Sequence, residues 1–205
     1  MMRVRLVSYV LLSLVFMYAT PLFAQSASSA TTGPGAISEV TQTIDEIIKI
    51  DALYVGDEKK TERRAKLREV IQPRFDFAEM AKRSLGAAWL EITPEQQVEF
   101  VAIFSDLLAA TYLSRIESIK EGMVRIDGEV LDGSRSLVKT IVESKGDKFP
   151  IDYKLILNAK NQWRVFDVVI ENIGLVSNYR AEFSGIIRRE KFEGLMVKLR
   201  EKSVK

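Results

Sequence analysis

The chain has 205 residues, 47% of them hydrophobic and 28% charged, which is typical of one globular domain with a core of its own. It contains no His and no Cys. This composition excludes His-based acid–base catalysis, thiol nucleophiles and disulfides, and it argues strongly against zinc sites.

The first 24 residues have the three-part pattern of a cleavable secretory signal peptide. Arg3 and Arg5 form a basic start, residues 6–19 are an uncharged apolar run, and Ala24 is the predicted cleavage point. A single membrane anchor is the alternative, but the run is short and no charged stop-transfer segment follows it. Cleavage leaves 28 basic and 28 acidic residues, a balance that disfavours a nucleic-acid-binding function.

Residues 25–35 are small and polar and predict a disordered leader before a domain at 36–205. The domain begins with a mainly helical part at 36–121, in which Ser38 is a candidate cap for the first helix. The pattern then predicts helices over 59–72, stopped by Pro73, and over 75–86, closed by Gly86.

The sequence around Thr93 predicts the start of the longest helix. Thr93 can act as the N-cap, Pro94 fits the first turn, and Gln96 completes a capping box. Apolar residues recur at helical spacing from Phe100 to Ile119, so we expect the helix to end near Ile119.

Residues 122–172 predict an antiparallel sheet, because four β-type runs are joined by short turns. The fourth run should place Val165, Asp167 and Val169 on one face and the residues between them on the other. Helices follow at 174–202, with a break near 191–194. The fold class is therefore α+β, with a four-stranded meander packed against helices. The four runs cover 123–131, 136–144, 149–158 and 162–172.

Carboxylates are the remaining candidates for catalysis. Asp152, Glu143, Glu171 and Asp167 could lie near one another on the sheet, where a carboxylate pair could hydrolyse a glycoside. The first three suit solvated strand faces or strand ends. Asp167 lies between two valines, and if buried it needs a donor from an Arg, a Tyr or a backbone amide. We therefore expect a structural role for Asp167 and no catalytic residue in the chain.

The apolar stripes are the positive signal in this sequence. The strands and helices offer more facing apolar surface than one thin core needs, so the stripes could close into a solid core or could surround a cavity. Periodicity alone leaves both possibilities open.

Six segments of the sequence resemble the MlaC family, also called the toluene-tolerance family, in the same order across residues 37–202. They are FDFAEMAKRSLG at 75–86 with Trp89, TPEQQ at 93–97, PIDY at 150–153, WRVFDVVIE at 163–171 and LVSNYR at 175–180, together with a helical segment that carries Phe104, Leu107, Leu108, Thr111 and Tyr112.

This resemblance implies a soluble periplasmic phospholipid carrier that is not an enzyme and needs no cofactor or metal. Its cargo would be diacyl glycerophospholipid, moved between an outer-membrane lipoprotein–porin complex and an inner-membrane ABC transporter that bears an MCE-domain protein. Such transport maintains the lipid asymmetry of the outer membrane. The implied fold is a twisted sheet with a helical subdomain, similar to the nuclear-transport-factor cone, with an apolar cleft between them. A solid-core adaptor protein and a carboxylate-based enzyme on the same scaffold remain the alternatives.

The apolar faces supply a candidate lipid-binding lining, which comprises Phe77, Leu85, Trp89, Phe100, Phe104, Leu108, Tyr112, Val138, Ile151, Tyr153, Val165, Val169, Leu175, Val176, Tyr179 and Phe183. Three basic residues near the start of the last helices, Arg180, Arg188 and Arg189, are candidates for docking to an acidic partner surface or to phosphate. A solvated helix face is the alternative interpretation of these arginines.

Overall fold

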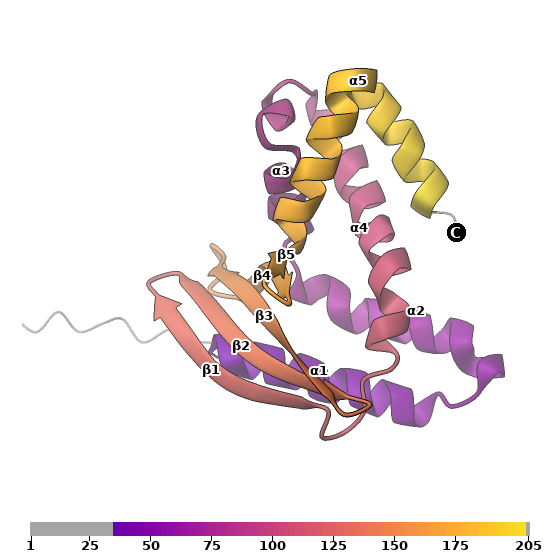
Figure 1. The fold of residues 1–205 in the computed structure, drawn as a ribbon, viewed down its shortest axis with the longest axis vertical. Coiled ribbons are helices and arrows are strands. Elements are labelled where there is room, and N and C mark those ends of the chain that lie inside the picture. The colour runs from indigo at the N-terminus through magenta and orange to yellow at the C-terminus, as the bar shows by residue number, and fades with distance from the viewer. Residues whose placement is uncertain (1–34, 204–205) are drawn as a thin grey trace, which may run out of the picture. The chain divides into compact units, whose positions relative to one another are not determined.

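The computed structural model describes residues 35–203, which all belong to one compact unit, Thr31–Lys205. The predicted signal peptide and all but the last residue of the predicted leader lie outside the described residues. The domain begins with helix α1 (Ala36–Leu53), followed by the short 3₁₀ turn η1 (Asp57–Lys59) and helix α2 (Lys60–Ile71) (Figure 1). Ser38 lies inside α1, so the prediction that it caps this helix is wrong; Gly35 occupies the N-cap position.

Helix α3 (Phe77–Leu85) follows the 3₁₀ turn η2 (Gln72–Arg74). The Asp76 carboxylate accepts a hydrogen bond from the Glu79 amide and caps α3. The Asp76 amide in turn donates to the Val165 carbonyl at 2.8 Å, and Phe75 pairs with Val165. These bonds tie the start of α3 to the edge of the sheet.

Helix α4 (Pro94–Ile116) follows the 3₁₀ turn η3 (Gly86–Leu90) and starts as predicted. Thr93 accepts from the Gln96 amide at 3.3 Å, and the Gln96 side chain accepts from the Thr93 amide at 2.9 Å, which confirms the capping box. The helix ends at Ile116, one turn before the predicted end.

The sheet is an antiparallel meander in the order β1-β2-β3-β4-β5. Its strands are β1 (Val124–Asp132), β2 (Arg135–Ser144), β3 (Asp147–Leu157), β4 (Trp163–Ile170) and β5 (Ile173–Gly174). The fifth strand was not predicted. It arises because Glu171 and Asn172, both with positive φ (49° and 68°), form a two-residue turn that brings Ile173 back beside Ile170.

A bulge in β4 overturns the predicted alternation of its side chains. Tyr153 pairs with Val168 and Leu155 pairs with Val165, so Phe166 is an extra residue in the ladder. Because Tyr153 and Leu155 share one face of β3, Val165 and Val168 share one face of β4. The prediction that Val165, Asp167 and Val169 lie on one face is therefore wrong.

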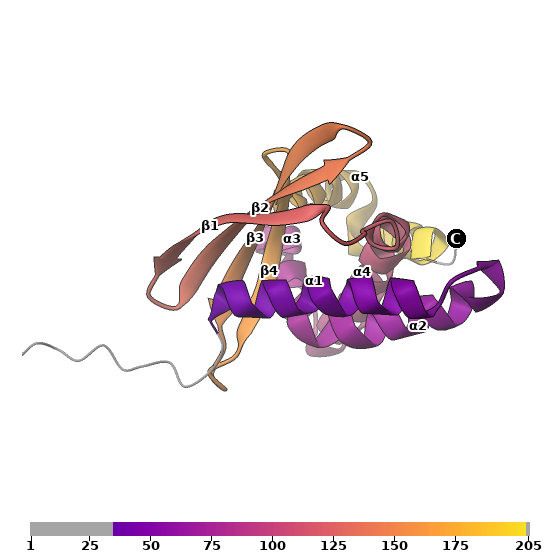
Figure 2. The same ribbon diagram turned by 90° about the horizontal axis from the view of Figure 1, so that it is seen from below.

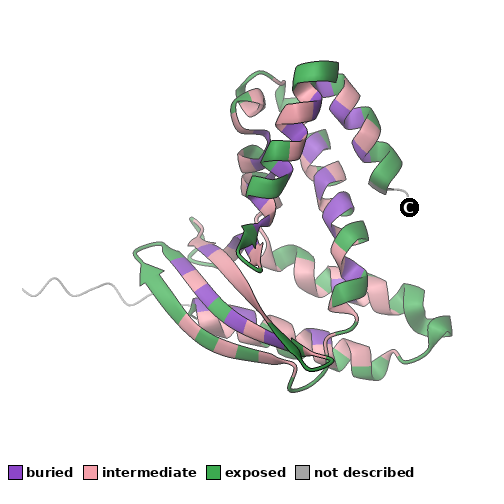
Figure 3. Cartoon of the chain, in the orientation of Figure 1, coloured by how far each residue is buried: buried purple, intermediate pink, exposed green. Residues whose placement is uncertain are grey.

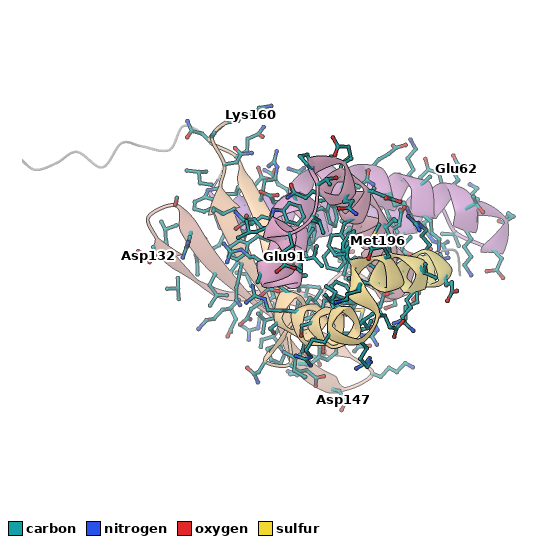
Figure 4. All side chains as sticks on the ribbon, turned by 90° about the horizontal axis from the view of Figure 1, so that it is seen from above. Glu62, Glu91, Asp132, Asp147, Lys160 and Met196 are labelled. Atoms are coloured by element: carbon teal, nitrogen blue, oxygen red, sulfur yellow. The ribbon has the colours of Figure 1, made fainter. Side chains whose placement is uncertain are left out.

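Helix α5 (Leu175–Ser203) is bent at Lys191, within the predicted break. Lys191 has φ 62° and ψ −178°, a conformation that normally requires glycine. The second half of the helix turns back toward α4, where Arg200 pairs with Glu99. Figure 4 shows Met196 in this second half, and its side chain is buried.

The core consists of three clusters of apolar side chains. The helical cluster joins α3, α4 and α5 and includes Phe166 from the sheet. The sheet cluster joins α1 to β2, β3 and β4, consistent with Figure 2, where α1 runs along one face of the sheet. The third cluster is the smallest and holds Ile47, Leu67 and Leu113 between α1, α2 and α4. Figure 3 shows the corresponding buried stretches on these helices and strands.

Candidate functional site

A cavity of about 420 Å³ lies among α2, α3, α4 and the sheet, within the range of about 300–1,000 Å³ common for ligand pockets. Most of its lining is apolar, and it is partly open to solvent. The apolar lining residues are Ile71, Phe75, Phe77, Met80, Leu108, Ala109, Tyr112, Leu113, Ile116, Ile119, Met123, Val142, Phe149, Ile151, Tyr153, Val168, Ile170 and Leu175.

The cavity lies where the three apolar clusters meet. Met80 belongs to the helical cluster, Val168 to the sheet cluster and Leu113 to the third cluster, and all three side chains line the cavity. All three clusters therefore border the cavity, and none of them encloses it alone. An apolar space of this kind favours an apolar guest over water.

A second, smaller cavity of about 90 Å³ lies between α1 and the sheet. Both cavities are lined by Ile71, Phe75, Ile116, Ile119 and Tyr153, so these residues form the partition between them.

The structure places the sequence-predicted lining residues in several different surroundings. Six of them line the larger cavity: Phe77, Leu108, Tyr112, Ile151, Tyr153 and Leu175. Val165 lines the smaller cavity, and Val138 is buried in the sheet cluster. Val169 pairs with Asp152 and Gly174 and is part of neither lining.

The remaining predicted lining residues belong to the helical cluster rather than to a cavity wall. Phe104 is fully buried, with its ring centroid 5.2 Å from that of Tyr179 and 5.6 Å from that of Phe183. Trp89 packs against the edge of this cluster. The buried members from the predicted lining are Leu85, Phe100, Phe104, Val176, Tyr179 and Phe183.

Several cavity residues were absent from the predicted lining. Ser105 and Ala109 lie on the cavity face of α4, three residues before Leu108 and Tyr112 respectively, so helical periodicity was the available signal. Val168 and Ile170 could not be assigned from the sequence, because the bulge at Phe166 decides which face of β4 points into the cavity.

Asp167 joins the sheet to the last helix. Its side chain is buried and accepts hydrogen bonds from the Lys154 ammonium at 2.9 Å and from the Val176 amide at 3.0 Å. The amide was among the expected donors, whereas the lysine was not. A Cβ added to Gly174 would lie 3.0 Å from the Asp167 carboxylate, so glycine permits this close approach. These hydrogen bonds satisfy the buried carboxylate of Asp167, so a structural role is enough to account for its burial.

Burial also changes the ionisation of two tyrosines. It raises the pKa of Tyr153, on the cavity wall, to about 12. Burial is also the main reason that the pKa of Tyr179 rises to about 12, with smaller effects from Tyr112 and Thr111. Both phenols therefore stay protonated and neutral at physiological pH.

The three predicted docking arginines differ in their surroundings. The Arg180 Nε atom donates to the Arg83 carbonyl at 2.6 Å and so satisfies the end of α3. Arg188 and Arg189 are exposed on α5. Arg83 itself stacks on the Phe166 ring, with its guanidinium carbon 4.6 Å from the ring centroid.

Within residues 35–203, no group of three or more Asp and Glu side chains is arranged to hold a metal ion. In the same part of the chain, none of the helices combines the length and apolar character needed to cross a bilayer.

This chain is similar to a known phospholipid-binding protein. A crystallised phospholipid-binding protein from Ralstonia solanacearum, solved in complex with a phospholipid, is 26% identical to this chain. The two structures superpose with a TM-score of 0.73 over 83% of this chain and 98% of the other. No curated protein matches the sequence at a significant level. The sequence model of the MlaC protein family matches residues 39–201, and the chain therefore belongs to the MlaC family.

Proposed function

We propose that this protein is a soluble periplasmic carrier that binds a diacyl glycerophospholipid by its acyl chains. The observation that carries the proposal is the partly open apolar cavity of about 420 Å³ at the junction of the three core clusters. The phospholipid bound to the similar Ralstonia solanacearum protein and the membership of the MlaC family support the same class of ligand.

The energetics of lipid transfer suit such a cavity. Two chains with about fifteen buried CH₂ groups each resist exposure to water by roughly 20 kcal/mol at ~0.8 kcal/mol per group. A carrier must offer an apolar space in exchange, and it needs no catalyst or cofactor to do so. The lipid-contacting residues in this proposal are Phe77, Leu108, Tyr112, Ile151, Tyr153 and Leu175, with Val165 in the adjoining smaller cavity.

In the cell, the carrier would receive lipid from an outer-membrane lipoprotein–porin complex or deliver lipid to it. The other exchange partner would be an inner-membrane ABC transporter with an MCE-domain protein, and the exchange would maintain the lipid asymmetry of the outer membrane. The chain would reach the periplasm through its N-terminal signal peptide. The exposed Arg188 and Arg189 are candidates for contact with an acidic partner surface.

Native mass spectrometry of the exported protein tests this proposal. We expect the wild-type protein to carry the added mass of a diacyl phospholipid. Ala109→Trp fills the cavity from α4 and should abolish the added mass, whereas Ala110→Trp places the same ring on the exposed side of the same helix and should leave it. A folded wild-type protein that takes up no lipid from vesicles would instead support a solid-core adaptor.

A further inference from the structure

The lining of the larger cavity contains few charged residues. They are Arg68 on α2, Arg115 in the last turn of α4, and Glu171 in the turn between β4 and β5. Because charged groups beside an apolar cavity cost desolvation energy unless they are solvated or paired, the surroundings of each show what it can bind.

The two arginines differ in their pairing. Arg68 is neutralised, because its Nη1 atom lies 3.1 Å from the Asp106 carboxylate. Arg115 makes no ion pair with any carboxylate in the described part of the chain, and its side chain is exposed. It therefore lies at the rim of the cavity, where it can meet a ligand and water together.

The contact that Arg115 does make leaves it able to bind an anion. Its guanidinium carbon is 5.8 Å from the centroid of the Tyr112 ring, which also lines the cavity. A guanidinium that rests its face on an aromatic ring keeps its N–H groups at the edge, where they can bind two oxygens of one phosphate. The contact with Tyr112 thus leaves the N–H groups of Arg115 able to bind a phosphate group.

The other polar residues of the lining set the balance of charge around the cavity. The Ser118 hydroxyl donates a hydrogen bond to the Arg115 carbonyl at 2.6 Å, so it cannot donate to a ligand at the same time. Ser144, at the end of β2, also lines the cavity. Glu171 is the one acidic lining residue and opposes binding of an anion, so Arg115 must supply the attraction.

We propose that Arg115 binds the phosphate of the lipid headgroup and thereby fixes the direction in which the lipid enters. The headgroup would lie by the C-terminal end of α4, and the acyl chains would run inward toward Met80. This inference rests on the proposed function, because it assumes that the cavity holds a phospholipid. It adds a preference for an anionic phosphate to the affinity that the chains supply.

Lipid uptake from vesicles by the exported protein tests the inference. The two probes are phosphatidylglycerol and diacylglycerol with identical acyl chains. Arg115→Gln should weaken phosphatidylglycerol binding about tenfold, the effect of losing one partly exposed charge-assisted contact. The same variant should change diacylglycerol binding less than twofold. Arg135→Gln removes an exposed arginine of β2 that is outside the cavity and should change neither affinity.

The outcomes separate this inference from the proposed function. Equal losses for both lipids in Arg115→Gln would show a packing role, and unchanged phosphatidylglycerol binding would show no headgroup contact; either result overturns the inference and leaves the carrier function standing. Wild-type protein that binds neither lipid would overturn the proposed function itself. Glycerol phosphate without acyl chains should not compete at millimolar concentration. Competition there would assign Arg115 to free phosphate esters and overturn the inference.

Discussion

The helical cluster and the sheet side of the domain are built from similar apolar stripes, but one is solid and the other is hollow. In the helical cluster, Phe100, Phe104 and Phe183 are fully buried, with ring centroids 5.6 to 5.8 Å apart. On the sheet side, Phe149, Ile151 and Tyr153 are only partly buried and face a cavity. The helices of the helical cluster pack through aromatic side chains, whereas the sheet and the helices that face it leave a space between them.

We expect this difference to separate stability from function. The helical cluster should supply most of the stability, and under the proposed function the sheet side exchanges a guest without losing that support. Stability and ligand binding should therefore respond to different substitutions.

The largest contrast is expected between two phenylalanines. Phe104→Ala removes a fully buried ring and should lower the free energy of unfolding by about 4 kcal/mol. Phe149→Ala, on the cavity wall, should cost only about 1–2 kcal/mol, because its ring already borders an empty space. Urea denaturation of both variants gives the comparison. Equal losses of unfolding free energy would contradict the distinction between a solid helical cluster and a hollow sheet side.

Asp167, which joins the sheet to the last helix, should be the next most sensitive position. Asp167→Ala leaves Lys154 and the Val176 amide without their partner and should cost about 2–3 kcal/mol of unfolding free energy. Asp167→Asn keeps an oxygen for the amide and should cost less. Asp152→Ala, on the neighbouring strand, is the matched control and should change stability by less than about 0.5 kcal/mol.

The same substitution tests the enzyme alternative. A carrier with Asp167→Asn should still bind and release lipid once folded. Loss of a chemical turnover in that folded variant would identify Asp167 as a catalytic group instead.

Alkaline pH should affect both halves through Tyr153 and Tyr179. Their pKa values of about 12 in the folded state exceed the value of about 10 in the unfolded chain. The protonated phenols therefore contribute their full stabilisation of the folded state below about pH 10. As the pH rises toward 12, the free energy of unfolding should fall by up to about 2 kcal/mol for each phenol. Each Tyr→Phe variant should show a smaller fall when the free energy of unfolding is measured as a function of pH.

The lipid distinguishes the two phenols. A guest in the cavity would keep water away from Tyr153, so lipid binding should raise the pKa of Tyr153 further and leave that of Tyr179 unchanged. Phenolate absorbance of the two single Phe variants, with and without lipid, provides the measurement. A parallel change in both would mean that emptying the cavity loosens the helical cluster too.

The smallest expected effect lies at the bend of α5. Lys191→Gly relieves a conformation that disfavours side chains and should raise the free energy of unfolding by about 1 kcal/mol. Lys198→Gly, in the regular part of the same helix, should lower it by a similar amount. Lipid binding should be unchanged in both variants, because neither residue lines the cavity.

Local physical chemistry in the sequence determined much of the fold. The capping box at Thr93 and Gln96 needs only residues three positions apart, and the break near Lys191 is equally local. The six motifs that resemble the MlaC family span the domain, and the family assignment agrees with them. The lack of His and Cys excludes whole classes of chemistry through composition alone.

Only the tertiary structure decided which apolar stripes close and which surround the cavity. The bulge at Phe166 turns that ring toward the helices and Val168 toward the cavity, and it depends on the pairing of β4 with β3. Whether Phe104 packs in a core or lines a cavity depends on side chains that lie more than seventy residues away, such as Tyr179. Periodicity shows that a face is apolar, but the facing elements determine whether protein or a guest completes it.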